Sequence, residues 1–415
     1  MAKKCSDLFL VLVLYFVFIQ STKSSLSQYK ISPIDFNALR DIKNQLTDFP
    51  SQHFFSTWNF SSPDPCSSFQ GVTCSSSGKV TVLALGTGLS DSPGLAGILS
   101  PSIAKLTQLN QLILFAGIVT GPIPPQIASL KNLRVISLTN NRLHGAIPTQ
   151  IFTLPNLHTL DLSHNHLSGS IPPTISGLTQ LKVLILGSNR LSGLLPGAFP
   201  DQLLHLDLSS NDFSGTLPRQ LPTALRYLSV AQNHMWGPLN GLEVLSYLVY
   251  LDLSMNQLSG PIPPSLFRPT LNSMLLQRNN LSGRVPQASP TTYVLGSGTI
   301  VDLSHNFLTG ELTPALIGVE TLFLNNNHLT GAVPKEYVDS INTGSMKTLY
   351  LQHNYITGFP LEAGRTLPDS ISVCLSYNCM VPPVGLTACP ASAGEQLSRP
   401  SYQCSAIRND SSSFD

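Results

Sequence analysis

The sequence predicts an α/β solenoid, in which short repeats stack and their strands form one parallel sheet on a concave face. The first observation is a pattern that recurs every 24 residues, at 133–148, 157–172 and 181–196. The second is the Leu-x-Leu string in each copy, such as Leu160 and Leu162, whose period of two is typical of a strand. A single copy cannot bury its own apolar edge, whereas a stack of copies can, so the repeats predict a solenoid.

The alternation of each strand predicts which side chains are inside. Leu160 and Leu162 are expected to point inward, and Thr159, Asp161 and Ser163 to point outward. Stacked strands lie about 4.8 Å apart, so the inward leucines form continuous columns. Each buried leucine is expected to stabilise the fold by about 1.5–3 kcal/mol.

An asparagine follows the strand in nearly every copy, and we interpret this series as a structural ladder. A buried amide has two donors and an acceptor for the backbone groups of its own turn and the neighbouring one. The second repeat has Gly117 at this position instead. The predicted ladder consists of Asn141, Asn165, Asn189, Asn211, Asn233, Asn256, Asn279, Asn306, Asn327, Asn354 and Asn378.

These residues also carry a resemblance to a known family. The L-x-x-L-x-L-x-x-N-x-L pattern, extended by L-x-G-x-I-P, is similar to that of plant-type extracellular leucine-rich-repeat proteins. In the second copy its fixed positions are Leu157, Leu160, Leu162, Asn165, Leu167, Gly169, Ile171 and Pro172. The chain resembles the ectodomains of receptor-like proteins and, more loosely, polygalacturonase-inhibiting proteins. The resemblance implies a right-handed superhelix with a second small sheet and a disulfide cap at each end.

The chain is expected to contain four parts. Residues 1–25 are expected to be a signal peptide, because Lys3 and Lys4 precede a twelve-residue apolar run at 8–19. Residues 26–79 are expected to form the N-terminal cap, with a helix over 34–46, and 80–378 an array of about 12 repeats. Residues 379–415 are expected to form the C-terminal cap and a Pro/Ser-rich tail over the surface.

Six cysteines follow the expected signal peptide. In a secreted chain with the N-terminal cap that the resemblance implies, Cys66 and Cys74 are expected to pair. The four others allow three pairings, and the sequence does not choose among them. The expected disulfide cysteines are Cys66, Cys74, Cys374, Cys379, Cys389 and Cys404.

Several features point to a secreted protein without a membrane anchor. After residue 19 no apolar run of about 18 residues occurs, and neither a GPI signal nor a kinase signature is present. Asn59, Asn280 and Asn409 begin sequons and are candidate glycosylation sites. With 11% charged residues and a net charge of +1, the composition argues against nucleic-acid binding.

Catalytic, metal and cofactor chemistry are not expected. Asp161, Asp207, Asp252 and Asp302 occupy equivalent positions in alternate repeats, so neighbouring carboxylates are about 10 Å apart and cannot share a proton. No H-E-x-x-H or C-x-x-C motif occurs. We therefore expect a protein that is not an enzyme and has no metal site and no cofactor.

The outward strand positions provide the candidate binding site. His205, Tyr227 and Tyr250 occupy the same position in three consecutive repeats, where strand stacking would place them side by side and exposed. The alternative is drift, because strands tolerate aromatic residues. Arg278 is interpreted as the one arginine on an outward strand position, without the Arg-x-Arg pair with which some plant receptors hold a peptide carboxylate. The candidate partner-binding residues are His205, Tyr227, Tyr250, Asp207, Asp252, Phe323, Tyr350 and Arg278.

The expected function is recognition of a protein or peptide in the plant cell wall space, in signalling or defence. The partner could be a receptor kinase ectodomain. One alternative is inhibition of a microbial or wall-modifying glycosidase, and another is a structural scaffold of the wall. Solenoids bind on the concave face, which favours binding over drift as the interpretation of the aromatic positions.

Overall fold

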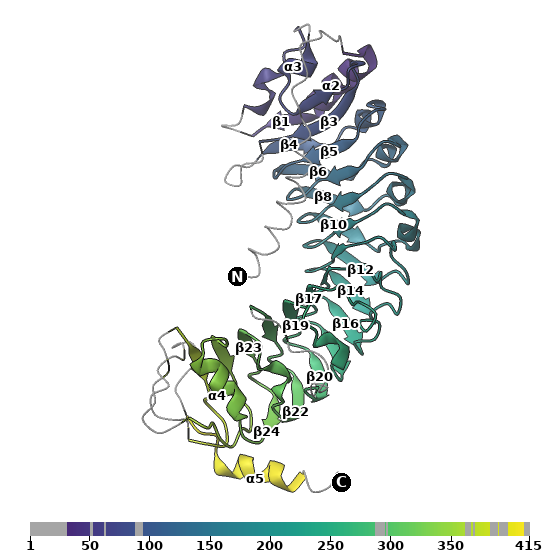
Figure 1. Cartoon of the computed structure of the whole chain (residues 1–415). Helices are drawn as coiled ribbons and strands as arrows, with labels where there is room; N and C mark the ends of the chain where they lie inside the picture. The colour runs from purple at the N-terminus through teal and green to yellow at the C-terminus, as the bar shows by residue number, and fades with distance from the viewer. Residues whose placement is uncertain are drawn as a thin grey trace.

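A computed structural model describes residues 31–49, 53–61, 64–87, 94–286, 295, 298–361, 367, 370–381, 389 and 397–410. The expected signal peptide lies outside these residues. The repeats stack in one curved array that runs from the N-terminal cap to α5 (Figure 1). The solenoid fold predicted from the repeats is confirmed.

The larger of two sheets, here called the main sheet, contains fourteen strands among the described residues. Its first strand is antiparallel to the second, and the others are parallel. In order the strands are β2 (Val72–Cys74), β3 (Val80–Leu85), β5 (Gln111–Leu114), β7 (Val135–Ser137), β9 (Thr159–Asp161), β11 (Val183–Ile185), β13 (His205–Asp207), β15 (Tyr227–Ser229), β17 (Tyr250–Asp252), β19 (Ser273–Leu275), β21 (Ile300–Asp302), β23 (Thr321–Phe323), β25 (Thr348–Tyr350) and β26 (Ser372–Cys374).

The second sheet contains twelve strands among the described residues and follows the main sheet repeat by repeat. It is the small second sheet that the resemblance implies. In order its strands are β1 (Leu46–Asp48), β4 (Leu95–Ile98), β6 (Ile118–Gly121), β8 (Arg142–Ala146), β10 (His166–Gly169), β12 (Arg190–Leu194), β14 (Asp212–Gly215), β16 (His234–Gly237), β18 (Gln257–Gly260), β20 (Asn280–Arg284), β22 (Phe307–Glu311) and β24 (His328–Thr330).

Short helices complete the repeats, and in the N-terminal half they lie on the outer side of the curve (Figure 1). Several 3-10 helices begin at a proline, which lacks the donor that a first turn leaves unpaired. The 3-10 helices are η1 (Phe54–Thr57), η2 (Pro101–Lys105), η3 (Pro125–Ser129), η4 (Thr149–Thr153), η5 (Pro173–Gly177), η6 (Pro264–Leu266) and η7 (Pro314–Leu316). The α-helices are α2 (Pro33–Gln45), α3 (Pro65–Ser68), α4 (Lys335–Asn342) and α5 (Ser401–Asp410).

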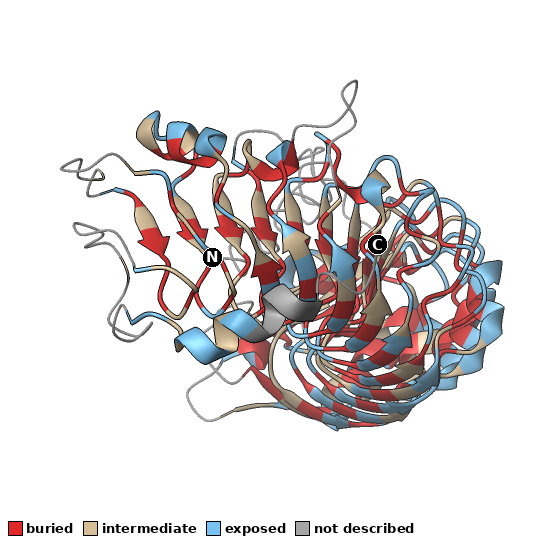
Figure 2. Ribbon diagram, turned by 90° about the horizontal axis from the view of Figure 1, so that it is seen from below, coloured by how far each residue is buried: buried red, intermediate tan, exposed pale blue. Residues whose placement is uncertain are grey.

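The core is a set of leucine columns between the two sheets. Leu160, Leu184 and Leu206 are register partners on adjacent strands and are at most 1% exposed. Strands of the main sheet such as β7 and β9 consist of buried and intermediate residues, whereas strands of the second sheet such as β8 and β10 also carry exposed residues (Figure 2). Because each repeat buries its leucines against the next, the stability of the array depends on contacts between neighbours.

The asparagine ladder bonds the turns together. The side-chain amide of Asn233 donates to the carbonyls of Leu208, Val230 and Ala231 at 3.0, 3.0 and 3.1 Å, and its Oδ1 accepts from Phe213 N at 2.9 Å. Two repeats are therefore bridged by one side chain. The same pattern of bonds to the preceding repeat recurs at Asn165, Asn189, Asn211, Asn256, Asn279, Asn306, Asn327, Asn354 and Asn378.

The ladder begins at Asn141, whose Oδ1 accepts from Val119 N at 3.1 Å. One repeat earlier, Gly117 has no space for a side chain. A Cβ there would lie 2.7 Å from the carbonyl oxygen of Leu95 and 3.1 Å from Oδ1 of Asn141. The missing rung is thus a consequence of close backbone packing next to the cap.

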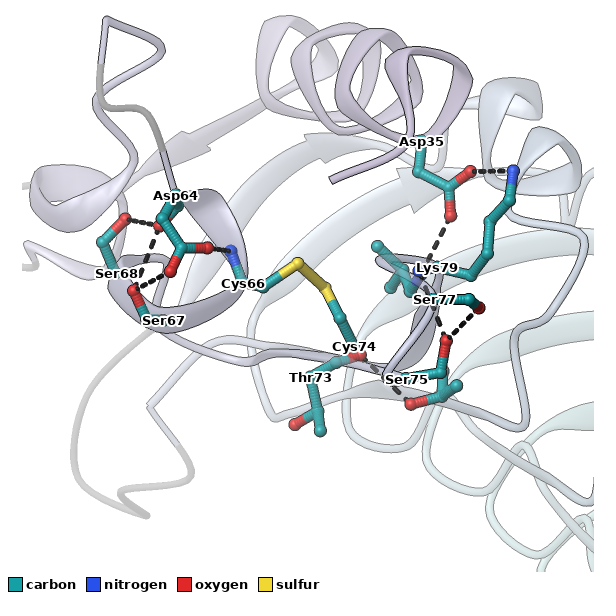
Figure 3. Close-up of a disulfide and its surroundings, with 12 residues drawn as sticks. Asp35, Asp64, Cys66, Ser67, Ser68, Thr73, Cys74, Ser75, Ser77 and Lys79 are labelled. Atoms are coloured by element: carbon teal, nitrogen blue, oxygen red, sulfur yellow. Dashed lines mark hydrogen bonds and ion pairs between the residues drawn. A yellow bond between two sulfur atoms is a disulfide. The ribbon is translucent and has the colours of Figure 1, made fainter. Parts of the chain in front are cut away.

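The N-terminal cap closes the first leucine column with α2 and an aromatic cluster. The expected helix ends at Gln45, because Leu46 begins β1, which pairs with β4. Buried Asp35 accepts from Val80 N at 2.9 Å and forms an ion pair with Lys79 at 3.3 Å (Figure 3). The indole of Trp58 stacks on Phe69 at 5.0 Å between ring centroids.

The Cys66–Cys74 disulfide joins α3 to β2 in this cap, as expected (Figure 3). Because the crosslink limits the unfolded chain, Cys66→Ser with Cys74→Ser should lower the free energy of unfolding by about 2–3 kcal/mol. Urea denaturation followed by tryptophan fluorescence measures this loss, since Trp58 lies in the same cap. A stability equal to that of the wild type would contradict the structural role of the disulfide.

The C-terminal cap has the pairs Cys374–Cys389 and Cys379–Cys404, one of the three pairings that the sequence left open. Residues 401–410 of the expected tail form α5, in which Ser401, Tyr402 and Ser405 are exposed. Arg399 attaches this segment to the array. Its Nε donates to the carbonyl of Asn354 at 2.9 Å, and its guanidinium lies over the rings of Tyr355 and Tyr377.

Candidate functional site

Three rings form a continuous stack in the middle of the main sheet. His205, Tyr227 and Tyr250 are register partners on β13, β15 and β17. The centroids of His205 and Tyr227 are 3.9 Å apart with the ring planes at 6°, and those of Tyr227 and Tyr250 are 4.4 Å apart at 1°. We call these three residues the aromatic stack. Parallel strands bring the rings to this distance, so the stack follows directly from the register.

The expectation that the whole aromatic stack is exposed is wrong. His205 is only 4% exposed, and Tyr227 and Tyr250 are half-buried. Face-to-face stacking covers the ring faces, which leaves the outer edges of Tyr227 and Tyr250 for a partner. Burial lowers the pKa of His205 to about 4, so its imidazole is neutral near pH 7. Burial also raises the pKa of both tyrosines, which therefore remain protonated hydrogen-bond donors.

Asp161, Asp207, Asp252 and Asp302 each accept hydrogen bonds from the turn that follows their strand. In Asp252, Oδ1 accepts from the backbone N of Ser254 at 3.0 Å and from its Oγ at 2.6 Å. Asp207 makes the same two bonds to Ser209, at 2.9 and 2.6 Å. The second oxygen of Asp252 accepts from the hydroxyl of Tyr250 at 3.4 Å. The Asp-x-Ser strings are therefore structural, and Asp252 also orients an aromatic side chain of the stack.

Asp161 was expected to point into solvent, but it is 5% exposed. Its neighbours on the closely spaced strands cover it, and its carboxylate is held by Ser163 N at 3.0 Å and Ser163 Oγ at 2.6 Å. Burial is the main cause that raises its pKa above 3.8. Burial likewise raises the pKa of Asp207, Asp252 and Asp302.

This burial predicts a pH effect on stability. Folding raises the pKa of this carboxyl group, so its protonated form is favoured in the folded state. Its contribution to stability is complete at pH values below the ordinary pKa of 3.8 and is lost as the pH rises through the pKa of the folded state. Asp161→Asn keeps the acceptor for Ser163 but does not ionise. The stability of this variant relative to the wild type should therefore increase between pH 3.5 and pH 7. Urea denaturation of both proteins at the two pH values measures the difference, and a constant difference would contradict the prediction.

Two further candidates lie apart from the aromatic stack. Phe323 and Tyr350 are register partners on β23 and β25, with centroids 5.0 Å apart at 82°. Placing Arg278 on a strand is wrong, because it follows β19 in the turn and has a φ of 57°. Arg278 is exposed, and its charge lowers the pKa of Asp302 on β21, although burial raises that pKa more.

The period-two interpretation missed one outward residue in each repeat. The backbone N atoms of Arg134 and Val135 both donate to the carbonyl of Asn110, at 2.8 and 3.2 Å. Two residues thus oppose one, as in a β-bulge, and Arg134 is exposed just before β7. The spacing of three residues between Leu133 and Ile136 could have indicated this bulge, because strict alternation allows only one residue between two inward apolar side chains.

The remaining predicted positions are surface features. Asn59 and Asn280 are exposed, and the side chain of Asn409 lies outside the described residues.

Among the described residues, no three His, Cys, Asp or Glu side chains are grouped to hold a metal ion. Over the same part of the chain, no helix has the length and apolar character needed to cross a membrane.

Three family models match the chain, over four segments. A leucine rich repeat N-terminal domain matches residues 32–75, which include α2 and the Cys66–Cys74 disulfide. Leucine rich repeat models match residues 131–191, 202–223 and 247–268. The chain is a leucine-rich-repeat protein. The cap and the repeats that the sequence predicted both belong to this family.

Solved structures similar to this leucine-rich-repeat protein include plant receptors. PEPR1–AtPEP1 has a TM-score of 0.65 at 26% identity, over 83% of this chain and 52% of that chain. The plant peptide hormone receptor RGFR1 in complex with RGF2 has a TM-score of 0.61 at 27% identity, over 71% and 52%. A TDR receptor has 0.60 at 27%, over 69% and 50%. The chain thus spans about half the length of these neighbours.

Proposed function

We propose that this protein is an extracellular binding protein that recognises a peptide or protein through the aromatic stack, in the plant cell wall space. The observation that carries the proposal is the stack itself. The half-buried rings of Tyr227 and Tyr250 stack on each other on the main sheet, and the buried imidazole of His205 supports the stack at one end. Aromatic side chains with a polar end are enriched at binding hot spots, because they bring a large contact area at little entropic cost.

Two further observations support this function. The disulfides at both ends are typical of proteins that fold in an oxidising compartment, which favours an extracellular location. One similar structure is described as a plant peptide hormone receptor in complex with RGF2. The proposal places the ligand on the main sheet because this is the broad face that a solenoid offers.

Affinity capture from secreted plant proteins and peptides tests the proposal. The tagged wild-type protein should retain a peptide or a receptor ectodomain that is absent from the same capture with Tyr227→Ala plus Tyr250→Ala. If the retained protein were instead a glycosidase whose activity falls on binding, the chain would be an inhibitor. Retention that is identical with both baits would contradict a role for the stack.

A further inference from the structure

A second column of side chains runs beside the aromatic stack, at the bulge that precedes each strand. Its members are bonded in series through the backbone. His158 N donates to the carbonyl of Arg134 at 2.8 Å, Lys182 N to that of His158 at 2.9 Å, Leu204 N to that of Lys182 at 2.9 Å, and Arg226 N to that of Leu204 at 2.9 Å. The five residues are therefore neighbours on consecutive repeats, and the last two lie beside His205 and Tyr227.

The positively charged residues of this column precede every second strand of the main sheet. Arg134, Lys182 and Arg226 are exposed, and within the described residues none of their side chains forms an ion pair or a hydrogen bond. We call these three residues the basic row. His158 lies between two of them, and the pKa of its imidazole is lowered by burial and then by the charges of Arg134 and Lys182. The local field is thus positive, and no acidic side chain among the described residues pairs with the row.

Carboxylates occupy the other side of the same face. Asp161, Asp207 and Asp252 lie on β9, β13 and β17. The residues of the basic row precede β7, β11 and β15, so the two sets alternate along the main sheet. Asp161 is buried and the other two are half-buried, and each accepts hydrogen bonds from its own turn. The basic row therefore carries the accessible charge of this part of the face, and the aromatic stack lies between the two columns.

We propose that the partner is an extended acidic peptide that lies across the strands, with acidic side chains at every third position facing Arg134, Lys182 and Arg226. Two strand spacings amount to about 9.6 Å. Three residues of polyproline II helix span about 9.3 Å and return to the same side of the peptide. The basic row thus matches the period of a polyproline II peptide. This inference rests on the proposed function and specifies its ligand.

A synthetic probe tests the charge and the period together. The probe is fluorescein-labelled acetyl-(Glu-Pro-Pro)3-amide, and the control probe has the same composition with its three glutamates adjacent. Fluorescence anisotropy at low salt should show binding of the first peptide and at least about tenfold weaker binding of the second. Arg134→Glu plus Lys182→Glu should weaken binding of the first peptide by at least about tenfold.

The second sheet offers a matched control variant. Arg142 and Arg190 are exposed on β8 and β12, also two strands apart, and Arg142→Glu plus Arg190→Glu makes the same change in charge. This variant should bind within about twofold of the wild type. Equal weakening by both variants, equal binding of both probes, or no binding to the wild type would overturn the inference, as would stronger binding of an oligogalacturonate than of the peptide.

The two proposals fail in different ways. If the natural partner is lost from the Tyr227→Ala plus Tyr250→Ala variant but kept by Arg134→Glu plus Lys182→Glu, the proposed function stands and the acidic-peptide inference is wrong. If the probe and the natural partner both depend on the basic row but not on the tyrosines, the site is assigned to the wrong column.

Discussion

Replacement of Asn233 by alanine should unfold the array at a much lower urea concentration than the wild type. The asparagine bridges two repeats with four hydrogen bonds, to Leu208, Val230, Ala231 and Phe213. Alanine leaves the backbone N of Phe213 without this acceptor, and an unsatisfied buried group costs about 1–3 kcal/mol. The three carbonyls lose one donor each but keep another, from Asn211, Asn256 and Ser210. We expect a loss of about 2–3 kcal/mol in the free energy of unfolding, measured by urea denaturation followed by circular dichroism.

Asn272→Ala is the matched control, because Asn272 is exposed just before β19. Its replacement should change the free energy of unfolding by no more than about 0.5 kcal/mol. A similar loss from the two variants would mean that the ladder contributes no more than an ordinary surface asparagine.

Tyr227→Ala plus Tyr250→Ala should abolish partner binding. Truncating two residues at the centre of an interface removes roughly 4 kcal/mol, which is about a 1,000-fold loss in affinity. Because Tyr227 and Tyr250 are half-buried and stack on each other, some loss of stability is also expected. Binding should therefore be measured by calorimetry at a temperature where circular dichroism shows the variant to be folded.

Two further variants separate binding from folding. Tyr227→Phe plus Tyr250→Phe retains the stacked rings but removes the hydroxyls, so stability should be kept while affinity falls by at least about tenfold. Val135→Ala plus Thr159→Ala alters the same column in the N-terminal half and should leave binding unchanged. Loss of binding from all three double variants, or from none, would show that the stack is not the contact surface.

The fold could be predicted from the sequence because each kind of periodic residue has a single structural role. The inward leucines and the asparagines recur at fixed positions, and the structure places Leu160, Leu184 and Leu206 in one column. The stacking of His205, Tyr227 and Tyr250 followed in the same way, since equal positions in parallel repeats become register partners.

Burial and irregular backbone could not be predicted from the period. An outward position does not mean exposure, because neighbours about 5 Å away cover small or aromatic side chains, as at Asp161 and His205. Arg278 lies in a left-handed turn that the strand pattern does not include. The bulge before each strand made Arg134 and Arg226 outward residues that strict alternation overlooks.

Site-specific photo-crosslinking tests the central claim most directly, because it reports which face touches the partner. Benzoylphenylalanine would replace Tyr250 on the main sheet in one protein and Arg142 on the second sheet in another, each mixed with the captured partner. The account predicts a covalent adduct from position 250 and none from position 142. An adduct from position 142 alone would contradict binding at the aromatic stack.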